Sequence, residues 1–199
     1  MIHVEEQPEP ANFDGDVRQK GLANMRRRGI DPNQPLPSGI KLKPCWRECL
    51  DDLYASYEGI CAYLAVYIVR GTGTASADHF VAKSAQPSLA YEWRNYRLAC
   101  LAMNRIKNKF EDVLDPFEVE NDWFHLELVS GRIYPNPSLD QPLMDSVEKT
   151  IKRLKLDEQI HRKMRLEHFL DCINKQVTQN HLRRHSPFVY YEAKRQGLL

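Results

Sequence analysis

Two stretches near the middle of the chain, SADHFVAKS at 76–84 and NYRLACLAMNRIKNKF at 95–110, decide the fold. The first stretch and the apolar, β-branched run before it, at 60–69, are expected to be short strands. Propensity alone predicts one continuous helix for the second stretch. In that helix, Asn95 and Asn104 would be nine residues apart and, at about 100° per residue, on nearly opposite faces. The two asparagines could then not serve one site.

The composition of the 199-residue chain is that of an ordinary soluble globular protein, with 42% hydrophobic and 28% charged residues. Its net charge of +1 excludes a global field that attracts nucleic acid or membrane, so any basic patch must be local. The sequence has neither an apolar run of membrane-spanning length nor a signal-peptide pattern. We therefore expect a cytoplasmic protein with no membrane partner. An odd number of cysteines at irregular spacings argues against a disulfide framework.

The expected fold is α+β and mainly helical, in three parts. Residues 1–44, rich in proline, glycine and charge, are predicted to form an extended N-terminal arm with a short helix at about 16–28. A core with a preceding helix and a following β-hairpin takes up 45–135, and a helical part takes up 136–199. The last helix is expected to begin at Ser186–Pro187, a good N-cap followed by proline. The other expected elements are helices at 46–57, 141–155 and 157–177 and a hairpin at 123–134.

Four polar residues with a distinctive spacing stand out in the core. Asp78 and His79 are adjacent, Asn95 follows sixteen residues after His79, and Asn104 follows nine residues after that. Carboxylate and amide oxygens are hard ligands that suit a magnesium-like ion. A histidine accepts a proton near neutral pH, because its unperturbed pKa is about 6.5. These residue types fit phosphodiester cleavage, which needs an activated water and neutralised charge at phosphorus.

This pattern resembles the HNH nucleases, which share the ββα-metal motif, over roughly residues 58–110. The resemblance implies a strand, a loop, a second strand and a helix. NYRLA at 95–99 would pair with ASADH at 75–79, and the helix would start near Leu101. Asn95 would then enter the second strand and Asn104 would lie in the first helical turns, so both could reach one site.

The resemblance also implies roles for the four residues. Asp78 and Asn104 would hold Mg²⁺ or Mn²⁺, and His79 would be the general base. Asn95 would steady the loop between the strands and so orient His79. We therefore expect a metal-dependent endonuclease that cuts DNA, with RNA not excluded. Similar small HNH proteins are subunits of bacterial anti-phage defence systems, where they often pair with an ATPase. An ATPase partner, docked on the arm and the C-terminal helices, is a further expectation.

The charge distribution favours a nucleic-acid substrate. Residues 79–110 contain six lysines and arginines and one acid, whereas residues 111–127 contain seven acids and no lysine or arginine. Cations near the scissile phosphate would stabilise its growing negative charge. The expected contacts to nucleic acid come from Lys83, Arg97, Arg105 and Lys107, with Lys107 best placed for the scissile phosphate.

The sequence departs from the family at the places where many HNH nucleases bind a structural zinc. The two C-x-x-C pairs are reduced to Cys61 and Cys100, with Leu64 and Met103 at the other positions. Two thiolates do not complete a tetrahedral site, so no structural zinc is expected and both replacements should pack in apolar surroundings. Ala82 also stands where the family usually has proline.

Two other interpretations stay open. The first is a non-catalytic module on an HNH-like fold that binds nucleic acid or a protein. The second is a helical interaction subunit that acts through its arm and C-terminal helices. Taken singly, a histidine on a strand is most often a structural residue, and a run of basic residues is most often a solvated face. Only the joint spacing of Asp78, His79, Asn95 and Asn104 favours the nuclease.

Overall fold

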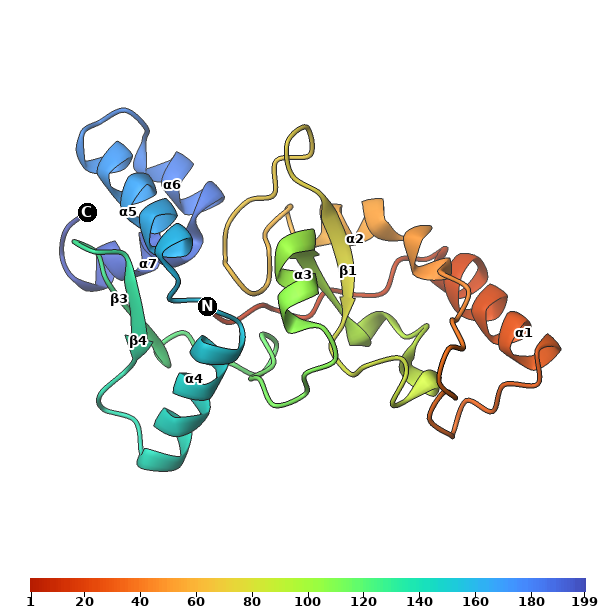
Figure 1. Cartoon of the computed structure of the whole chain (residues 1–199). Coiled ribbons are helices and arrows are strands. Elements are labelled where there is room, and N and C mark those ends of the chain that lie inside the picture. The colour runs from red at the N-terminus through yellow and green to blue at the C-terminus, as the bar shows by residue number, and fades with distance from the viewer. The chain divides into compact units, whose positions relative to one another are not determined.

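The computed structural model describes all 199 residues, which form seven α-helices and two separate two-stranded antiparallel sheets (Figure 1). The predicted α+β, mainly helical class is confirmed. No helix is long and apolar enough to cross a membrane. The chain divides into two compact units, each built from separate segments. The central unit contains Glu6–Gly59 and Val69–Glu111, and the C-terminal unit contains Met1–Glu5, Ile60–Ile68 and Asp112–Leu199.

This division differs from the three predicted parts. Most of the predicted arm belongs to the same compact unit as the strand–strand–helix segment. The predicted hairpin belongs with the C-terminal helices, so the change of unit falls at residues 111 and 112 rather than at 135. Short segments at 1–5 and 60–68 also join the C-terminal unit, which a reading of consecutive residues could not indicate.

The central unit contains the predicted strand–strand–helix segment. Strand β1 (Ala75–His79) pairs antiparallel with β2 (Tyr96–Cys100), and helix α3 (Leu101–Lys107) follows β2 without a loop. The register places Asp78 opposite Arg97 and His79 opposite Tyr96. The helix begins where the ladder ends, and the amide of Leu101 donates to the carbonyl of Thr74 at 2.9 Å. Residues 95–104 are therefore not one helix, and Asn95 and Asn104 lie at opposite ends of β2.

Helices from the first third of the chain complete this unit. A π-helical turn, Asp14–Gln19, runs into α1 (Lys20–Arg27), close to the predicted helix at 16–28. A 3₁₀ turn at Cys45–Arg47 precedes α2 (Leu50–Ser56), within the predicted helix at 46–57. The loop between β1 and β2 contains two further 3₁₀ turns, Pro87–Leu89 and Trp93–Asn95.

The irregular part of the arm is fixed to this unit by hydrogen bonds. The amide of Leu36 donates to the carbonyl of Ser84 at 2.8 Å, and the hydroxyl of Tyr91 donates to the carbonyl of Lys43 at 2.9 Å. Arg28 donates to the carbonyl of Lys41 at 2.6 Å. These bonds satisfy backbone groups of a segment without regular structure, so the arm is an integral part of the central unit.

The predicted strand at 60–69 is wrong. The segment forms a tight turn with a single bridge between Ile60 and Tyr67, and Ala65 has a positive φ of 51°. The amide of Ala65 donates to Cys61 O, and that of Cys61 donates to Val66 O, both at 2.8 Å. Residues 61–66 and Ile68 are buried in the C-terminal unit, whereas Val69 is 52% exposed and belongs to the central unit. Their β-branched and aromatic character thus reflects burial rather than strand pairing.

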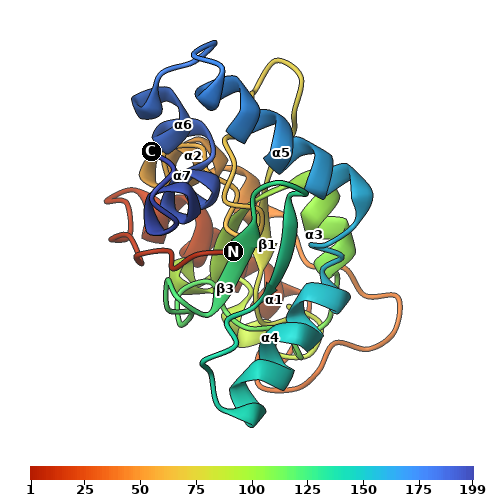
Figure 2. The same cartoon turned by 90° about the vertical axis from the view of Figure 1, so that its left-hand side faces the viewer.

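The C-terminal unit contains the predicted hairpin and helices. Strand β3 (Phe124–Glu127) pairs antiparallel with β4 (Arg132–Pro135). The later elements are α4 (Gln141–Arg153), α5 (Gln159–Ile173), α6 (Gln179–His185) and α7 (Pro187–Arg195), and α5, α6 and α7 pack on one another (Figure 2). Helix α7 begins after Ser186 as predicted, whereas α6 was not predicted. Thr178 caps α6 by accepting from the amide of His181 at 3.1 Å.

Buried charged side chains join the hairpin to the helices of this unit. Arg165 of α5 is 3% exposed and donates to the carbonyls of Gly131 and Leu156 at 2.8 and 2.9 Å. Burial lowers the pKa of Arg165 to about 10, so the guanidinium stays charged at neutral pH. Glu192 of α7 is 2% exposed and accepts from the amide of Leu126 at 2.6 Å. The hairpin is therefore held by charge-assisted bonds as well as by apolar packing.

Gly131 is expected to be the least replaceable glycine of this unit. It has a φ of +68°, and an added Cβ would lie 2.0 Å from the carbonyl oxygen of Arg162. Gly131→Ala should lower the free energy of unfolding by about 3 kcal/mol, because backbone strain and a backbone clash add together. Gly197→Ala is the matched control, since its φ is +69° with open space around it, and should lower stability by about 1 kcal/mol. Denaturant unfolding would measure both, and equal effects would contradict the packing of Gly131 against α5.

Candidate functional site

A groove of about 880 Å³ in the central unit brings together three of the four spaced residues, and Asn95 is not among those that line it. Asp78 and His79 line it at the end of β1, and Asn104 lines it from α3. Two of the predicted cations, Lys83 and Arg105, line it as well. The groove is also lined by residues from the predicted arm and from the start of the helix expected at 46–57, which were not expected at this site. They are Leu36, Ile40, Lys41, Pro44, Trp46 and Arg47.

His79 is held by a hydrogen bond that fixes its tautomer. Its Nε2 lies 2.9 Å from the carbonyl oxygen of Ala90. A carbonyl can only accept, so Nε2 carries the hydrogen and Nδ1 keeps the free lone pair. The ring also makes edge-to-face contacts with Trp46 and Tyr96, at centroid distances of 4.7 and 5.0 Å. The imidazole therefore has one orientation and one nitrogen able to accept a proton.

The electrostatic surroundings keep His79 neutral. Its side chain is 5% exposed, and burial, with a smaller effect from the positive charge of Lys83, lowers its pKa to about 3. Neutral imidazole is the form that a general base requires. A pKa this low also makes His79 a weaker base than a solvated histidine. A negative charge beside Lys83 would raise the pKa of His79, because it would offset the charge that disfavours protonation.

Asn95 joins both ends of the loop between the strands. Its Oδ1 accepts from the amide of Val81 at 2.8 Å, and its Nδ2 donates to the carbonyls of Val81 and Leu89 at 3.1 and 3.0 Å. Leu89 directly precedes Ala90, the residue whose carbonyl holds His79. Asn95 is 4% exposed and, unlike Asp78 and His79, does not line the groove. Its contacts are those of a residue that positions His79 through the loop.

Asp78 and Asn104 supply oxygen atoms to the groove. Asp78 is 2% exposed, and its Oδ2 lies 3.8 Å from the Nζ of Lys107. The amide nitrogen of Asn104 donates to Ser76 Oγ at 3.1 Å and to Ala77 O at 3.3 Å. Because these bonds use the nitrogen, Oδ1 of Asn104 is left without a hydrogen bond. A carboxylate and an unbonded amide oxygen in one groove fit a magnesium-type cation, which takes few protein ligands and several waters.

No group of three or more histidine, cysteine, aspartate or glutamate side chains is arranged to hold a metal ion. A magnesium-type site does not need one, because one or two carboxylates and the substrate phosphates commonly suffice. Leu64 and Met103, at the positions of the missing zinc ligands, are 8% and 0% exposed.

Lys107 and Arg97 do not lie where direct contact with nucleic acid was predicted. Lys107 is fully buried, and its Nζ donates to the carbonyl of His79 at 3.0 Å and to that of Phe80. Arg97 is 4% exposed and donates to the carbonyls of Arg94 and Tyr96 at 2.7 and 3.1 Å. Both cations satisfy backbone carbonyls around the two strands and neither lines the groove, so their contact with nucleic acid stays a prediction. The sequence did not indicate that Arg97 and Lys107 are buried, because both lie among other basic residues that are exposed.

The groove is cationic even without these two residues. Its charged lining residues are one acid, Asp78, and five cations, namely Lys41, Arg47, Lys83, Arg105 and Lys109. Desolvation lowers the pKa of Lys83, and the carboxylate of Asp78 acts in the opposite direction. Lys41 was not predicted as a contact, because the arm at 1–44 was expected to dock a protein partner, and Arg47 was assigned to the helix expected at 46–57. Their signal was present as basic residues among the apolar ones at 40–47.

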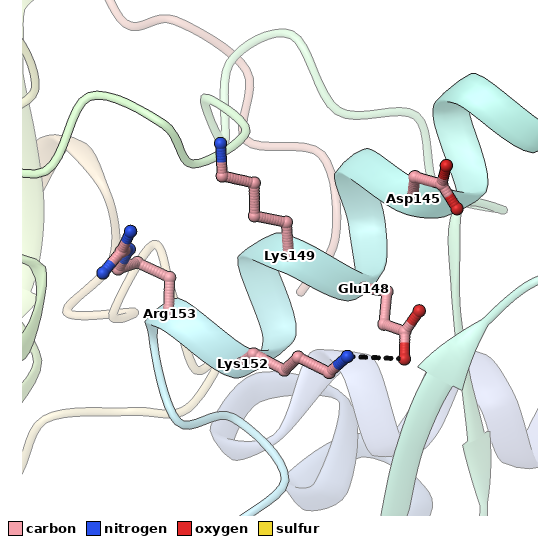
Figure 3. Close-up of a pocket in the computed structure, with 5 residues that line it drawn as sticks. All are labelled: Asp145, Glu148, Lys149, Lys152 and Arg153. Atoms are coloured by element: carbon pink, nitrogen blue, oxygen red, sulfur yellow. Dashed lines mark ion pairs between the residues drawn. The ribbon is translucent and has the colours of Figure 1, made fainter.

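A second depression, on the surface of α4, carries no comparable chemistry. Its lining side chains have both signs of charge, and Lys152 pairs with Glu148 at 3.0 Å (Figure 3). Lys149 and Arg153 both pair with Asp112, at 3.2 and 2.7 Å. The charges of these side chains therefore offset one another.

Comparisons with known proteins leave the chain without an assigned family. No protein-family model matches it, and no curated protein matches its sequence. The resemblance to HNH nucleases therefore rests on the four spaced residues and on the geometry described above.

The buried, neutral His79 predicts a specific pH dependence. The unfolded chain takes up a proton on this residue near pH 6.5, whereas the folded chain does so only near pH 3. The free energy of unfolding should therefore fall as the pH drops from about 6.5 towards 3, with a slope of up to about 1.4 kcal/mol per pH unit from this group. His79→Gln should show a shallower slope. Nitrogen NMR should find hydrogen on Nε2 and not Nδ1, and titration of His79 near pH 6.5 would contradict the described environment.

The structural role of Lys107 gives a second prediction. Lys107→Met should lower the free energy of unfolding by about 1–3 kcal/mol, because the carbonyls of His79 and Phe80 lose their buried donor. Arg105→Met, on the exposed side of the same helix, should change stability by about 0.5 kcal/mol or less. Chemical denaturation of both variants would test this, and a fully stable Lys107→Met variant would count against it.

Proposed function

We propose that the central unit is a metal-dependent HNH-type endonuclease that hydrolyses phosphodiester bonds in DNA. The observation that carries the proposal is the hydrogen bond from Nε2 of His79 to the carbonyl of Ala90. It leaves Nδ1 as a proton acceptor on a residue that lines the same cationic groove as Asp78 and Asn104. The strand–strand–helix order and the antiparallel register support the same assignment.

In this proposal, His79 accepts the proton of the attacking water at Nδ1. Asn95 and Tyr96 keep the imidazole in place, the first through the loop and the second by donating to Ala90 O at 2.8 Å. The phosphate of a bound substrate would offset the positive charge near His79 and raise its pKa from about 3. The proton affinity of the base would then increase only when substrate is present.

Asp78 and the free Oδ1 of Asn104 would hold the divalent cation, Mg²⁺ or Mn²⁺. When bound, such an ion neutralises charge on the scissile phosphate and on the leaving oxygen. The exposed cations Lys41, Arg47 and Arg105 would attract the polynucleotide backbone and release its counterions. Binding should consequently weaken as the salt concentration rises.

A non-catalytic binding module is the second candidate. The observation in its favour is the burial of His79, which is 5% exposed and whose pKa of about 3 makes it a poor base until a substrate is bound. The same cationic groove would then bind nucleic acid without cutting it. Cleavage assays separate the two candidates.

The resemblance to small nuclease subunits of bacterial anti-phage defence systems supports a broader proposal. In that setting the protein would act in the cytoplasm, and an ATPase partner would control cutting. Since the arm is part of the groove, the C-terminal unit is the better remaining surface for such a partner. Co-purification with an ATPase, followed by an activity assay of the complex, would test this.

Cleavage of DNA should depend on His79 and on a divalent cation. Plasmid or oligonucleotide substrate incubated with the full chain and Mg²⁺ or Mn²⁺ should be cut, and EDTA should abolish cutting. His79→Ala should lower the rate about 10²–10⁴-fold, because it removes the general base. Asn104→Ala should raise the metal concentration needed for half-maximal activity, because one oxygen ligand is lost.

His161→Ala is a suitable control for this assay. His161 lies in the C-terminal unit, where its Nδ1 lies 2.9 Å from the carbonyl of Lys155, and it should leave the rate unchanged. Circular dichroism would confirm that each variant is folded. Metal-dependent cutting that survives in a folded His79→Ala variant would exclude His79 as the base.

A further inference from the structure

The arm supplies a wall to the groove whose chemistry differs from that of the other lining residues. This segment, 36–47, is here called the arm wall. It places four large apolar residues and proline in the groove, together with two cations. Its lining residues are Leu36, Ile40, Leu42, Pro44, Trp46, Lys41 and Arg47. The rest of the groove is mainly polar and charged, with Asp78, Lys83, Asn104, Asn108 and Lys109 among its residues.

The arm wall is held against the loop that follows β1. The amide of Leu36 bonds to the carbonyl of Ser84, next to Lys83, and Tyr91 bonds to the carbonyl of Lys43. The Nζ of Lys83 also lies 5.0 Å from the centre of the Trp46 ring, a cation–π contact. A segment anchored in this way is preformed, so binding a ligand against it requires little ordering of the chain.

Two apolar residues of the arm wall are exposed. Ile40 is 39% exposed, and Pro44 is exposed as well. A DNA duplex presents sugars and charged phosphates on its outside and keeps the flat faces of its bases stacked inside. Apolar side chains gain little against such a surface. An unpaired strand exposes base faces, and single-strand binding sites combine a cationic groove with apolar or aromatic platforms for those bases.

We propose that the groove takes a single-stranded polynucleotide, with its unpaired bases against the arm wall. The phosphates would lie along Lys41, Arg47, Lys83, Arg105 and Lys109. Ile40 and Leu36 would contact the base faces, and Arg47 and Arg105 add planar groups on which bases can stack. This inference deepens the proposed function and rests on it for the cutting step, but the binding step can be measured without cleavage.

Binding of labelled oligonucleotides to the full chain tests the proposal. Fluorescence anisotropy in EDTA would compare an unstructured 20-nucleotide DNA strand, the RNA strand of the same sequence and the DNA duplex. At least one single strand should bind about 10-fold or more tightly than the duplex, since each base contact contributes about 1–3 kcal/mol. Comparison of the DNA strand with the RNA strand identifies which sugar is preferred.

Two variants separate base contacts from phosphate contacts. Ile40→Ser should weaken single-strand binding about 5-fold and leave duplex binding nearly unchanged, because it removes an apolar contact without removing charge. Lys41→Ala should weaken both kinds of binding and reduce the salt dependence by about one phosphate contact. Val129→Ser is the matched control, since Val129 is 80% exposed in the C-terminal unit and should have no effect.

Duplex binding as tight as single-strand binding, or equal loss of both in Ile40→Ser, would overturn the inference. Repeating the experiment with Mg²⁺ or Mn²⁺ measures cutting as well as binding, so the single-strand inference and the nuclease proposal can fail independently. Selective single-strand binding with no cutting under either metal would support the arm wall and reject the nuclease. Cutting that favours duplex would support the nuclease and reject the arm wall.

Discussion

The hydrogen bond between Nε2 of His79 and the carbonyl of Ala90 is the interaction on which the candidate site depends. It selects the tautomer and fixes the ring, and the local structure is organised around it. Asn95 forms hydrogen bonds with both Val81 and Leu89, which fixes the position of the loop that contains Ala90. Tyr96 bonds to the same carbonyl from the neighbouring strand. Tyr96 of β2 and Asn95, at the end of the loop between the strands, thus hold this carbonyl oxygen in one position.

Buried cations form a second level of support. Lys107 donates to the carbonyls of the last residue of β1 and of the residue that follows it. Arg97 and Lys107 both lie against the ring of Phe80, at 5.1 and 5.0 Å from its centre. These charges surround a carboxylate, Asp78, that is itself 2% exposed. Asp78 therefore lies in a positive environment, which an anionic ligand would complement, whereas His79 is neutral mainly because it is buried.

The sequence was sufficient for the strand–strand–helix segment only together with the resemblance to HNH nucleases, because propensity alone predicts one continuous helix at 95–110. It was also sufficient for the hairpin at 123–134 and for the start of α7, where turn and capping residues are local signals. It was insufficient where burial decides. The run at 60–69 has strand-like composition but forms a buried turn, and the basic stretch hides the difference between exposed Arg105 and buried Lys107. The division into two interleaved units depends on long-range packing, which no local pattern encodes.

Because the arm is anchored to the loop after β1, the candidate site residues and the surface around them come from two different segments of the chain. The candidate site residues come from 78–104, whereas much of the surface around them comes from 36–47. Substitutions in the earlier segment can therefore alter which molecules fit without disturbing the histidine or its neighbours. In the proposed nuclease, changes in this segment would alter the range of targets while the candidate site at 78–104 stayed constant.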